Sequence, residues 1–576
     1  MDTRDEKKND GGAEVVKHYA DDHFTHPLPT QAQWDSLRQV ADVVPITAWL
    51  VVAVEFCERF TYYGLSGPFQ NYIQFPYTTQ HSAYLAAGAL GKGQQAATAL
   101  TTFFQFFCYI TPIAGAIIAD QYLGKYKTIF IFCIIYMVGL IVITATSIPA
   151  SILSGAAYPG FIVGIIIIGF GTGGIKSNVS PLVAEQYTNK HAYVKRLSNG
   201  EEVIVTPQAT IQKIFNWFYW GINVGSLSSI ATTEIEKWDS FWLAYLLPLL
   251  MFFGAIGVLV YGRNKYIQNP PRGSILLEAF KAMSMGMRAG NGLMKLDRAK
   301  PSYLQENRPE LLGSVTWDDV FIDELKRALK ACVVFLWFPV YWVCYSQITN
   351  NLISMAATML TGDVPNDIMQ NIDPITLIIF IPIMDAFIYP GFRKLGIAMG
   401  PIRRITIGFA LAAVAIGYTA VIQHLVYSAP PNYDCPSCDP SGQPNWISAA
   451  YQVPSYFFIA LSEIFASITG LEYAFNKAPE SMKSVVMALF LLTNAGGSVL
   501  AFAFVPVTVD PLLVWMYTGV ASGMGVVTIL FWICHHKNDY TDAEEDAISR
   551  QPQADADYVK GGNMVQLNEF DDAARV

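Results

Sequence analysis

The first long apolar stretch of the sequence carries an unusual density of charged and phenolic side chains. An α-helix turns about 100° per residue, so Glu55, Glu58, Arg59, Tyr62 and Tyr63 would lie within roughly 140° of its circumference. One helix face would then present two carboxylates, a guanidinium and two phenols. Either Glu55 and Arg59 form a structural ion pair one helical turn apart, or the second carboxylate has a raised pKa and exchanges a proton.

The composition places this face in a membrane protein. Only 14% of the 576 residues are charged, 52% are hydrophobic and the mean hydropathy is +0.32. Soluble globular proteins carry about 25% charged residues. The net charge of −9 gives no reason to expect nucleic-acid binding. The cytoplasmic segments contain no nucleophile–base pair, metal-ligand cluster or phosphate-binding loop, so an enzyme is not expected.

The uncharged stretches predict an all-α protein with twelve transmembrane helices, because a helix needs roughly 20 apolar residues to cross a bilayer. Eight spans are strongly apolar, and four contain charged or many polar residues, at about 46–75, 210–231, 374–392 and 453–476. With the N-terminus inside, Lys and Arg concentrate in the even-numbered loops, whereas the odd-numbered loops contain only Lys92 and Lys237. This asymmetry predicts cytoplasmic termini.

The central charged segment divides the helices into six and six. We therefore predict five regions: a cytoplasmic N-terminal tail, an N-terminal six-helix bundle, a cytoplasmic linker, a C-terminal six-helix bundle and an acidic cytoplasmic tail, at 1–45, 46–262, 263–330, 331–536 and 537–576. Within the linker, 272–295 predicts either an amphipathic helix on the inner membrane surface or an ordinary linker helix. In the predicted external loop, Cys435 and Cys438 are either a local disulfide or two free thiols.

Four further ionisable residues lie within or near the predicted spans: Lys176, Asp385, Glu463 and Glu472. A charge near the bilayer centre costs at least about 2.5–3.5 kcal/mol, so such side chains normally face a bundle interior or an aqueous cavity. Lys176 ends an uncharged helix, where it either faces the interior or extends to the membrane edge. Glu463 has no cation within a helical turn, so its partner must come from another helix or from a ligand. For Asp385 and Glu472 we expect packing or interfacial roles.

A charge count suggests what such a cavity would bind. If Glu55, Glu58 and Glu463 share one cavity with Arg59 and Lys176, one net negative charge remains when all are ionised. One bound proton neutralises it. A zwitterionic ligand adds no net charge and supplies one partner for Glu463 and another for a cation. The count therefore favours a proton together with a ligand that has separated amine and carboxylate ends.

Four motifs, in order along both halves, resemble those of the proton-dependent oligopeptide transporters, a branch of the major facilitator superfamily. They are Glu55-x-x-Glu58-Arg59-Phe60-x-Tyr62-Tyr63-Gly64, Pro112-x-x-Gly115-x-x-x-Ala119-Asp120-x-x-x-Gly124-Lys125, Phe218-Tyr219-x-x-Ile222-Asn223-x-Gly225-Ser226 and Ala478-Pro479-x-x-Met482-Lys483-Ser484. The resemblance covers about 45–535. The insert at 199–206 and the lack of extra central helices look most similar to fungal and plant di- and tripeptide transporters.

The resemblance implies a two-bundle, alternating-access symporter that imports di- and tripeptides with protons across the plasma membrane. It implies proton coupling by Glu55, Glu58 and Arg59, with protons as the coupling ion, no cofactor, and a monomer as a sufficient unit. By position it implies a substrate site at Arg59, Tyr62, Tyr63, Lys176, Asn223, Asp373, Glu463, Ser467 and Phe490. Arg59 and Lys176 would meet the peptide carboxylate, and Glu463, helped by Asn223, its amino terminus.

Two positions depart from the family pattern. Many relatives carry an acid on the seventh helix that can pair with the fourth-helix lysine, but here the segment reads Tyr345-Ser346-Gln347. The sequence therefore does not identify the residue that would pair with Lys176 in a gate. Asp373 stands where relatives often have asparagine, which would add an acid near the amine pocket.

Two other functions remain to be weighed. Relatives of this family also move nitrate or other small anions, and Glu463 argues against these substrates because an anion gains nothing from a carboxylate. A non-transporting nutrient sensor is weakly consistent with the long acidic tail and central loop. The intact set of Glu55, Glu58 and Arg59 argues against it.

Overall fold

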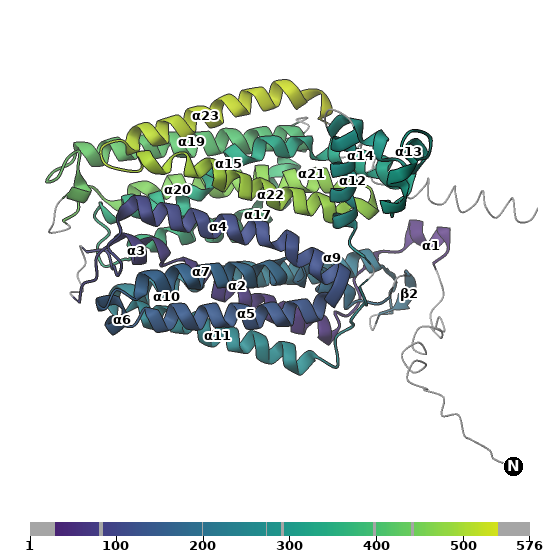
Figure 1. Ribbon diagram of the computed structural model, residues 1–576, viewed down its shortest axis with the longest axis horizontal. Helices are drawn as coiled ribbons and strands as arrows, with labels where there is room; N and C mark the ends of the chain where they lie inside the picture. The colour runs from purple at the N-terminus through teal and green to yellow at the C-terminus, as the bar shows by residue number, and fades with distance from the viewer. Residues whose placement is uncertain are drawn as a thin grey trace, which may run out of the picture.

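The computed structural model describes residues 29–79, 85–189, 191–197, 200–271, 273–289, 293–395, 399–438 and 443–539. Much of both predicted tails, 1–28 and 540–576, lies outside these ranges. The described chain forms two neighbouring groups of helices, one from each half of the sequence, and a smaller group from the central segment at one end (Figure 1).

The helices of the N-terminal half surround the first apolar stretch. They are α2 (Ile46–Ser66), α3 (Phe69–Gln74), α4 (Gly93–Ile118), α5 (Lys125–Thr146), α6 (Pro149–Leu153), α7 (Ala157–Lys176), α8 (Val179–Glu185), α9 (Pro207–Ser226), α10 (Ser228–Trp238) and α11 (Phe241–Gly262). A short helix, α1 (Gln31–Ser36), precedes them, and the central segment contributes α12 (Ile275–Ala289), α13 (Pro301–Asn307) and α14 (Asp319–Ala331).

The helices of the C-terminal half are more often interrupted by short 3₁₀ and π segments. They are α15 (Phe338–Ser346), α16 (Asn351–Ala357), α17 (Ile372–Ile383), α18 (Tyr389–Lys394), α19 (Pro401–Ser428), α20 (Val453–Glu463), α21 (Thr469–Lys477), α22 (Lys483–Phe502) and α23 (Leu513–His535). Two of the short segments matter below: the 3₁₀ helix η6 (Asn366–Asn371) and the π-helix η10 (Ile464–Ile468).

Ten helical segments in the described residues are long and apolar enough to span a membrane. They include two of the four weaker predicted spans, within Asn366–Phe392 and Ala449–Lys477. The other two weaker spans correspond to α2 and α9, which carry charged and amide side chains. The apolarity of the chain therefore supports ten of the twelve expected crossings directly.

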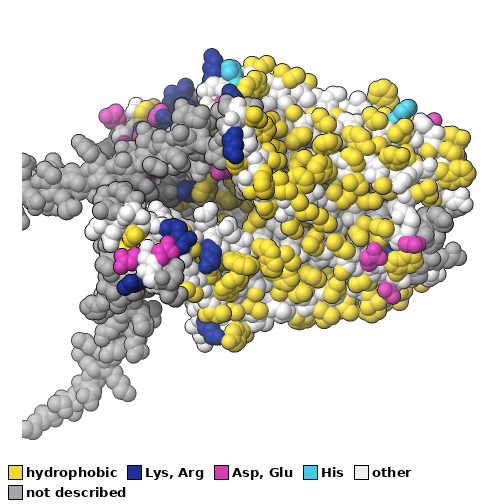
Figure 2. Space-filling model, turned by 180° about the vertical axis from the view of Figure 1, so that it is seen from behind, with side chains coloured by type: hydrophobic (Ala, Val, Ile, Leu, Met, Phe, Trp, Pro, Cys, Tyr) yellow, Lys and Arg dark blue, Asp and Glu magenta, His cyan; other side chains and the backbone are white. Residues whose placement is uncertain are grey.

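The outer surface of the helices suits a lipid environment. Exposed Ile131, Ile134, Val138 and Ile141 recur at helical spacing on α5, and similar side chains cover α11, α19 and α23. Figure 2 shows a broad hydrophobic face, with Lys and Arg side chains gathered at the end that carries the central segment and few at the other. A large exposed apolar surface of this kind is typical of membrane-embedded proteins.

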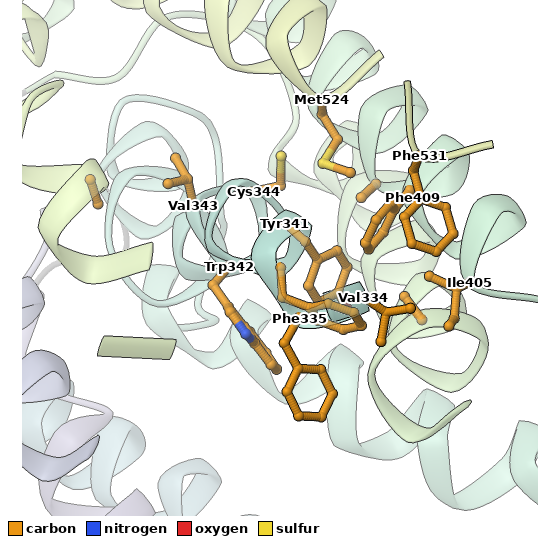
Figure 3. Packing of buried hydrophobic residues seen from close by; sticks show 14 of the residues in the cluster. Val334, Phe335, Tyr341, Trp342, Val343, Cys344, Ile405, Phe409, Met524 and Phe531 are labelled. Atoms are coloured by element: carbon orange, nitrogen blue, oxygen red, sulfur yellow. The ribbon is translucent and has the colours of Figure 1, made fainter. Parts of the chain in front are cut away.

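Each half has its own hydrophobic core. One core gathers side chains from Val44 to Tyr266, and the other from Leu276 to Phe531. In the second core, the ring of Phe409 stacks on Tyr341 at 5.7 Å between centroids and lies edge-on to Phe531 at 5.1 Å (Figure 3). Helix α4 also packs against α22 across the boundary between the halves.

A small sheet, which the all-α expectation did not include, lies outside the helical spans. Strand β3 (Glu202–Val205) pairs antiparallel with β2 (Tyr193–Arg196) and parallel with β1 (Gln39–Val40). It joins the residues before α2 to the segment before α9, which are far apart in the sequence. In the loop between α19 and α20, Cys435 is disulfide-bonded, and the side chain of Cys438 lies outside the described residues.

Hydrogen bonds between the two halves concentrate at the end opposite α12–α14. Asn71 and Asn366 exchange a pair of amide hydrogen bonds of 2.9 Å each. The Ser229 hydroxyl donates to Asn371 at 2.5 Å, and the Gln70 amide donates to Ser354 at 2.9 Å. Figure 1 places α3, α6 and α10 at this end. We call it the closed end.

Candidate functional site

The charged face of α2 points into the protein. Glu55, Glu58 and Arg59 are buried, and Nε of Arg59 lies 3.1 Å from Oε1 of Glu55. The same guanidinium contacts the Glu58 carboxylate and lies 5.4 Å from the ring centre of Tyr62. One arginine therefore pairs with two buried acids, so at most one acid is fully compensated by its charge.

Lys176 faces the same region instead of the membrane edge. Its ammonium lies 3.7 Å from the ring centre of Tyr109 on α4, a cation–π contact. Its electrostatic neighbours also include Arg59, Glu58 and Glu55. Ser346, at the position where the resemblance implies an acid in many relatives, donates instead to the carbonyl of Val343 in its own helix.

Glycines let the helices approach closely enough to bring these side chains together. A Cβ atom at Gly115 of α4 would come within 2.3 Å of the carbonyl oxygen of Gly173 on α7. A Cβ atom at Gly225 of α9 would meet Cβ of Arg59 at 3.0 Å. The first crossing requires glycine, and the second leaves little room for a side chain. The first sets Lys176 beside Tyr109, and the second sets α9 directly against the charged face of α2.

Helix α9 contributes a polar pair next to α2. The Asn223 side-chain amide donates to the backbone carbonyl of Tyr219 at 2.8 Å. Tyr219 in turn has Glu463, Tyr63 and Asp373 among its electrostatic neighbours. Asn223 thus lies next to a phenol that faces the acids of the C-terminal half.

The C-terminal half presents two acids around one phenol. The Tyr345 hydroxyl donates to Oδ2 of Asp373 at 3.2 Å and also lies within hydrogen-bonding range of Glu463. Oδ1 of Asp373 and Oε2 of Glu463 are buried and accept no hydrogen bond from the described residues. Among these residues, no lysine or arginine is an electrostatic neighbour of either acid. A cationic group of a ligand would satisfy both oxygens.

The remaining predicted residues flank this acidic pocket. Ser467 is buried in the π-helix η10, which begins directly after Glu463. π-Helical turns inside α-helices are frequent at functional sites. Phe490 of α22 packs against Phe335 and Phe338, with ring centroids 5.3 and 5.9 Å away. Its ring is half-buried, so one side belongs to the core of this half.

Tyrosines connect the two groups of charges. The electrostatic neighbours of Tyr63 include Arg59 and Glu58 on one side and Glu463 and Asp373 on the other. Tyr109 likewise lies near both Arg59 and Glu463. The structure thus brings the predicted cationic and acidic residues to one region, with phenols between them. The sequence-based site did not include Tyr109, Tyr219 or Tyr345.

This region has more acid than the sequence-based count assumed. With Asp373 included, four carboxylates face two cations, Arg59 and Lys176. Two net negative charges remain if all are ionised. Burying such an excess is costly, so protons or a ligand amine would stabilise it.

Comparison with known proteins identifies the kind of molecule to which this site belongs. The sequence profile of the POT family matches residues 126–536. The chain is 47% identical over 532 residues to the probable peptide transporter ptr2 of Schizosaccharomyces pombe, across 91% of this chain and 83% of that protein. It is 42% identical over 532 residues to the peptide transporter PTR2 of Saccharomyces cerevisiae, across 92% and 85%.

Solved structures share the fold at lower sequence identity. A crystal structure of the POT family transporter PepTSo, determined in meso, aligns with a TM-score of 0.67 at 21% identity, over 86% of this chain and 99% of that one. An auto-inhibited POT family peptide transporter aligns with a TM-score of 0.64 at 21% identity, over 85% and 96%. The fold and its relatives define a multi-pass membrane transporter, not an enzyme. The chain belongs to the POT family, the proton-dependent oligopeptide transporters, which confirms the resemblance seen in its motifs.

Proposed function

We propose that this protein is a proton-coupled symporter that imports di- and tripeptides through a central site holding both charged peptide ends. The observation that carries the proposal is the division of the site. Arg59 and Lys176 lie on the N-terminal half, and Glu463 and Asp373 lie on the C-terminal half, with tyrosines between them. A peptide carboxylate matches the first pair and a peptide amine the second. The phenols can contact the constant backbone without selecting a side chain.

Glu55 and Glu58 supply the proton-coupling step in this proposal. Both share the single guanidinium of Arg59. When one acid is protonated, Arg59 is less strongly held and can turn toward a peptide carboxylate. When the proton leaves, the guanidinium returns to two carboxylates and the peptide is released. The inward movement of a proton gains about 2.3 kcal/mol per charge per 100 mV, in addition to the pH gradient.

Alternating access follows from two rigid halves around this site. We propose twelve spans, with α2 and the α9–α10 segment as the two that carry too much polar surface to stand out by apolarity. The Lys- and Arg-rich end with the central segment then faces the cytoplasm, and the closed end faces outside. A plasma-membrane location agrees with import from the medium. A monomer contains the whole site.

Uptake of a labelled dipeptide into proteoliposomes, with and without an inside-negative and inside-alkaline gradient, tests the proposal. We expect accumulation driven by the gradient in the wild type, none with Glu58→Gln and strongly reduced uptake with Glu463→Ala. Glu472→Gln, an exposed acid on the neighbouring α21, is the matched control and should transport normally.

The other functions give different results in the same assay. Dipeptide binding without accumulation would indicate a sensor. Movement of nitrate with no response to dipeptide would show that the substrate assignment is wrong.

A further inference from the structure

A second pair of acids lies far from the central site, at the closed end. Glu236 on α10 and Asp367 on η6 come from opposite halves and are 2% and 0% exposed. Their carboxyl groups lie within hydrogen-bonding range of each other. Two ionised carboxylates cannot form a hydrogen bond, because neither has a hydrogen to donate. A direct hydrogen bond between the two acids therefore requires a proton on one of them.

The hydrogen-bond donors around Glu236 and Asp367 do not take the place of this proton. The Asn71 amide donates to Oε1 of Glu236 at 2.9 Å. In the described part of the chain, no donor with hydrogen-bonding geometry reaches Oε2 of Glu236 or either oxygen of Asp367. A shared proton would link one oxygen of each acid.

The charged groups around the pair have both signs. Lys237 donates to the backbone carbonyls of Gly362 and Val364. The titratable groups that face the pair or its lysine from the packed elements are Lys237 and Glu234 of α10, Asp363 before η6, Tyr245 of α11 and Tyr456 of α20. Lys237 and Glu234 act on Asp367 in opposite directions, so the burial of both acids is the stronger reason for a bound proton.

A cavity at the closed end reaches Glu236. It has a volume of about 200 Å³ and is lined by Glu236 and Lys237, by Ser147 at the end of α5, and by Tyr77 in the segment after α3. Water in this cavity would connect Glu236 with the solution on that side. A proton could therefore reach the acid without passing the central site.

We propose that Glu236 and Asp367 form a second proton-binding site, which joins the two halves at the closed end while the proton is bound. Separation of the halves at this end would move α10 away from η6 and split the pair. The proton would then leave, and both acids would ionise in contact with water. Binding from an acidic exterior would instead favour closure, which adds a protonation step to the proposed transport cycle.

The sign of the pH effect follows from linkage. One proton is bound in the closed arrangement and lost on opening, so the opening equilibrium constant rises by up to about tenfold per pH unit over the pH range in which the closed pair holds a proton and the separated acids do not. Glu236→Gln or Asp367→Asn places a permanent amide donor opposite the remaining carboxylate. Either variant should keep this end closed regardless of pH.

Distances between spin labels test the proposal without any transport. Labels at Leu153→Cys and Trp446→Cys, which are 75% and 69% exposed on opposite halves, report closure in a Cys534→Ser background. From about pH 5 to about pH 9, the wild type should shift toward longer distances, whereas Glu236→Gln and Asp367→Asn should not shift. Glu234→Gln, a half-buried acid on the same helix, is the matched control and should behave as the wild type.

Three results would contradict the proposed shared proton. They are the absence of a shift in the wild type, a shift as large as that of the wild type in either amide variant, and loss of the shift in Glu234→Gln. This second proton site depends on the proposed function only for the assignment of the closed end to the outside of the membrane. A protein that moves no peptide yet shows this pH response would contradict the proposed function and support the proton site.

Discussion

At the scale of single residues, the arrangement around Tyr345 explains how a carboxylate pair can select an amine. Tyr345 has one hydroxyl hydrogen, and it donates to Asp373 while lying beside Glu463. One phenol cannot satisfy two acids, so each retains an oxygen without a donor from the described residues. An ammonium has three donors on a compact charge and can satisfy both acids together. A nitrate or other anion would add repulsion here.

We predict that Glu463→Gln weakens recognition of the peptide amine without disturbing the rest of the site. A hydrogen bond to a charged group contributes about 1.5–3 kcal/mol, which corresponds to roughly a 10- to 150-fold rise in KM for a free dipeptide. The measurement is competition of labelled dipeptide uptake by the free peptide and by its N-acetylated form.

The acetylated peptide provides the internal control for this prediction. It has no ammonium, so Glu463→Gln should hardly change its weak inhibition. If the variant loses both inhibitors to the same degree, Glu463 supports the shape of the site rather than the amine.

The site residues that could be predicted from sequence are those whose charge is costly to place inside a membrane. A charge inside an apolar stretch needs a reason, and this argument alone identified Glu55, Glu58, Arg59, Lys176 and Glu463. Tyrosine carries no such signal, because it occurs equally in cores and at membrane interfaces. Tyr219 stands in one of the four motifs, but Tyr109 and Tyr345 could be recognised only once helices from both halves were placed together.

At the scale of helices, the site depends on where α4, α7 and α9 cross their neighbours. The crossing of α4 and α7 is close enough that the backbone of Gly173 lies where a side chain at Gly115 would stand. This crossing holds Tyr109 and Lys176 in contact from two helices. A wider crossing would separate the ammonium from the ring and from Arg59.

We therefore predict that Gly115→Val lowers both stability and transport. Overpacking in a well-packed region typically costs 1–3 kcal/mol, and a contact with backbone leaves little room for relief, so about 3 kcal/mol is expected. Thermal unfolding of the purified protein in detergent measures the loss. Gly257→Val on α11 is the matched control, because no atom lies within 4 Å of a Cβ atom there. Equal stability of the two variants would contradict the role assigned to this crossing.

The helices differ in how far sequence could predict them. Long uncharged stretches predicted most spans, because apolar length is required to cross a bilayer. α2 was harder to assign, since the charged residues to which we assign proton coupling also lower its apolarity. The π-turn after Glu463 has no local sequence signature, because it depends on packing. The pairing of β1 with β3 has none either, because it joins segments about 160 residues apart, with Gln39 opposite Ile204.

At the scale of the whole molecule, the interactions between the two halves differ from the interactions within each half. Each half has an extensive apolar core, which resists rearrangement because packed interiors deform little. At the closed end, the contact between halves includes neutral hydrogen bonds from asparagine, glutamine and serine. Such bonds contribute only about 0.5–1.5 kcal/mol each, because water replaces them when they break. Opening can therefore occur without unfolding either half.

The amide pair between Asn71 and Asn366 gives a direct test of this view. Asn366→Ala removes both reciprocal hydrogen bonds and leaves Asn71 free to donate to Glu236. The loss of two neutral hydrogen bonds, about 1–3 kcal/mol in total, should raise the equilibrium constant for opening of this end by roughly 5- to 150-fold. Spin labels at Leu153→Cys and Trp446→Cys should then report longer distances at every pH, with the response to pH preserved.

Asn178→Ala is the matched control for that prediction. Asn178 is also a buried asparagine, but its amide donates to the carbonyls of Gly115 and Gly174 within the N-terminal half. Its loss should lower the unfolding temperature and leave the distance between the halves unchanged. If Asn178→Ala opens the closed end as far as Asn366→Ala does, the equilibrium responds to general loosening of the fold. If only Asn366→Ala opens it, the reversible contacts between two stable halves set the balance between the states, as the proposed alternating access requires.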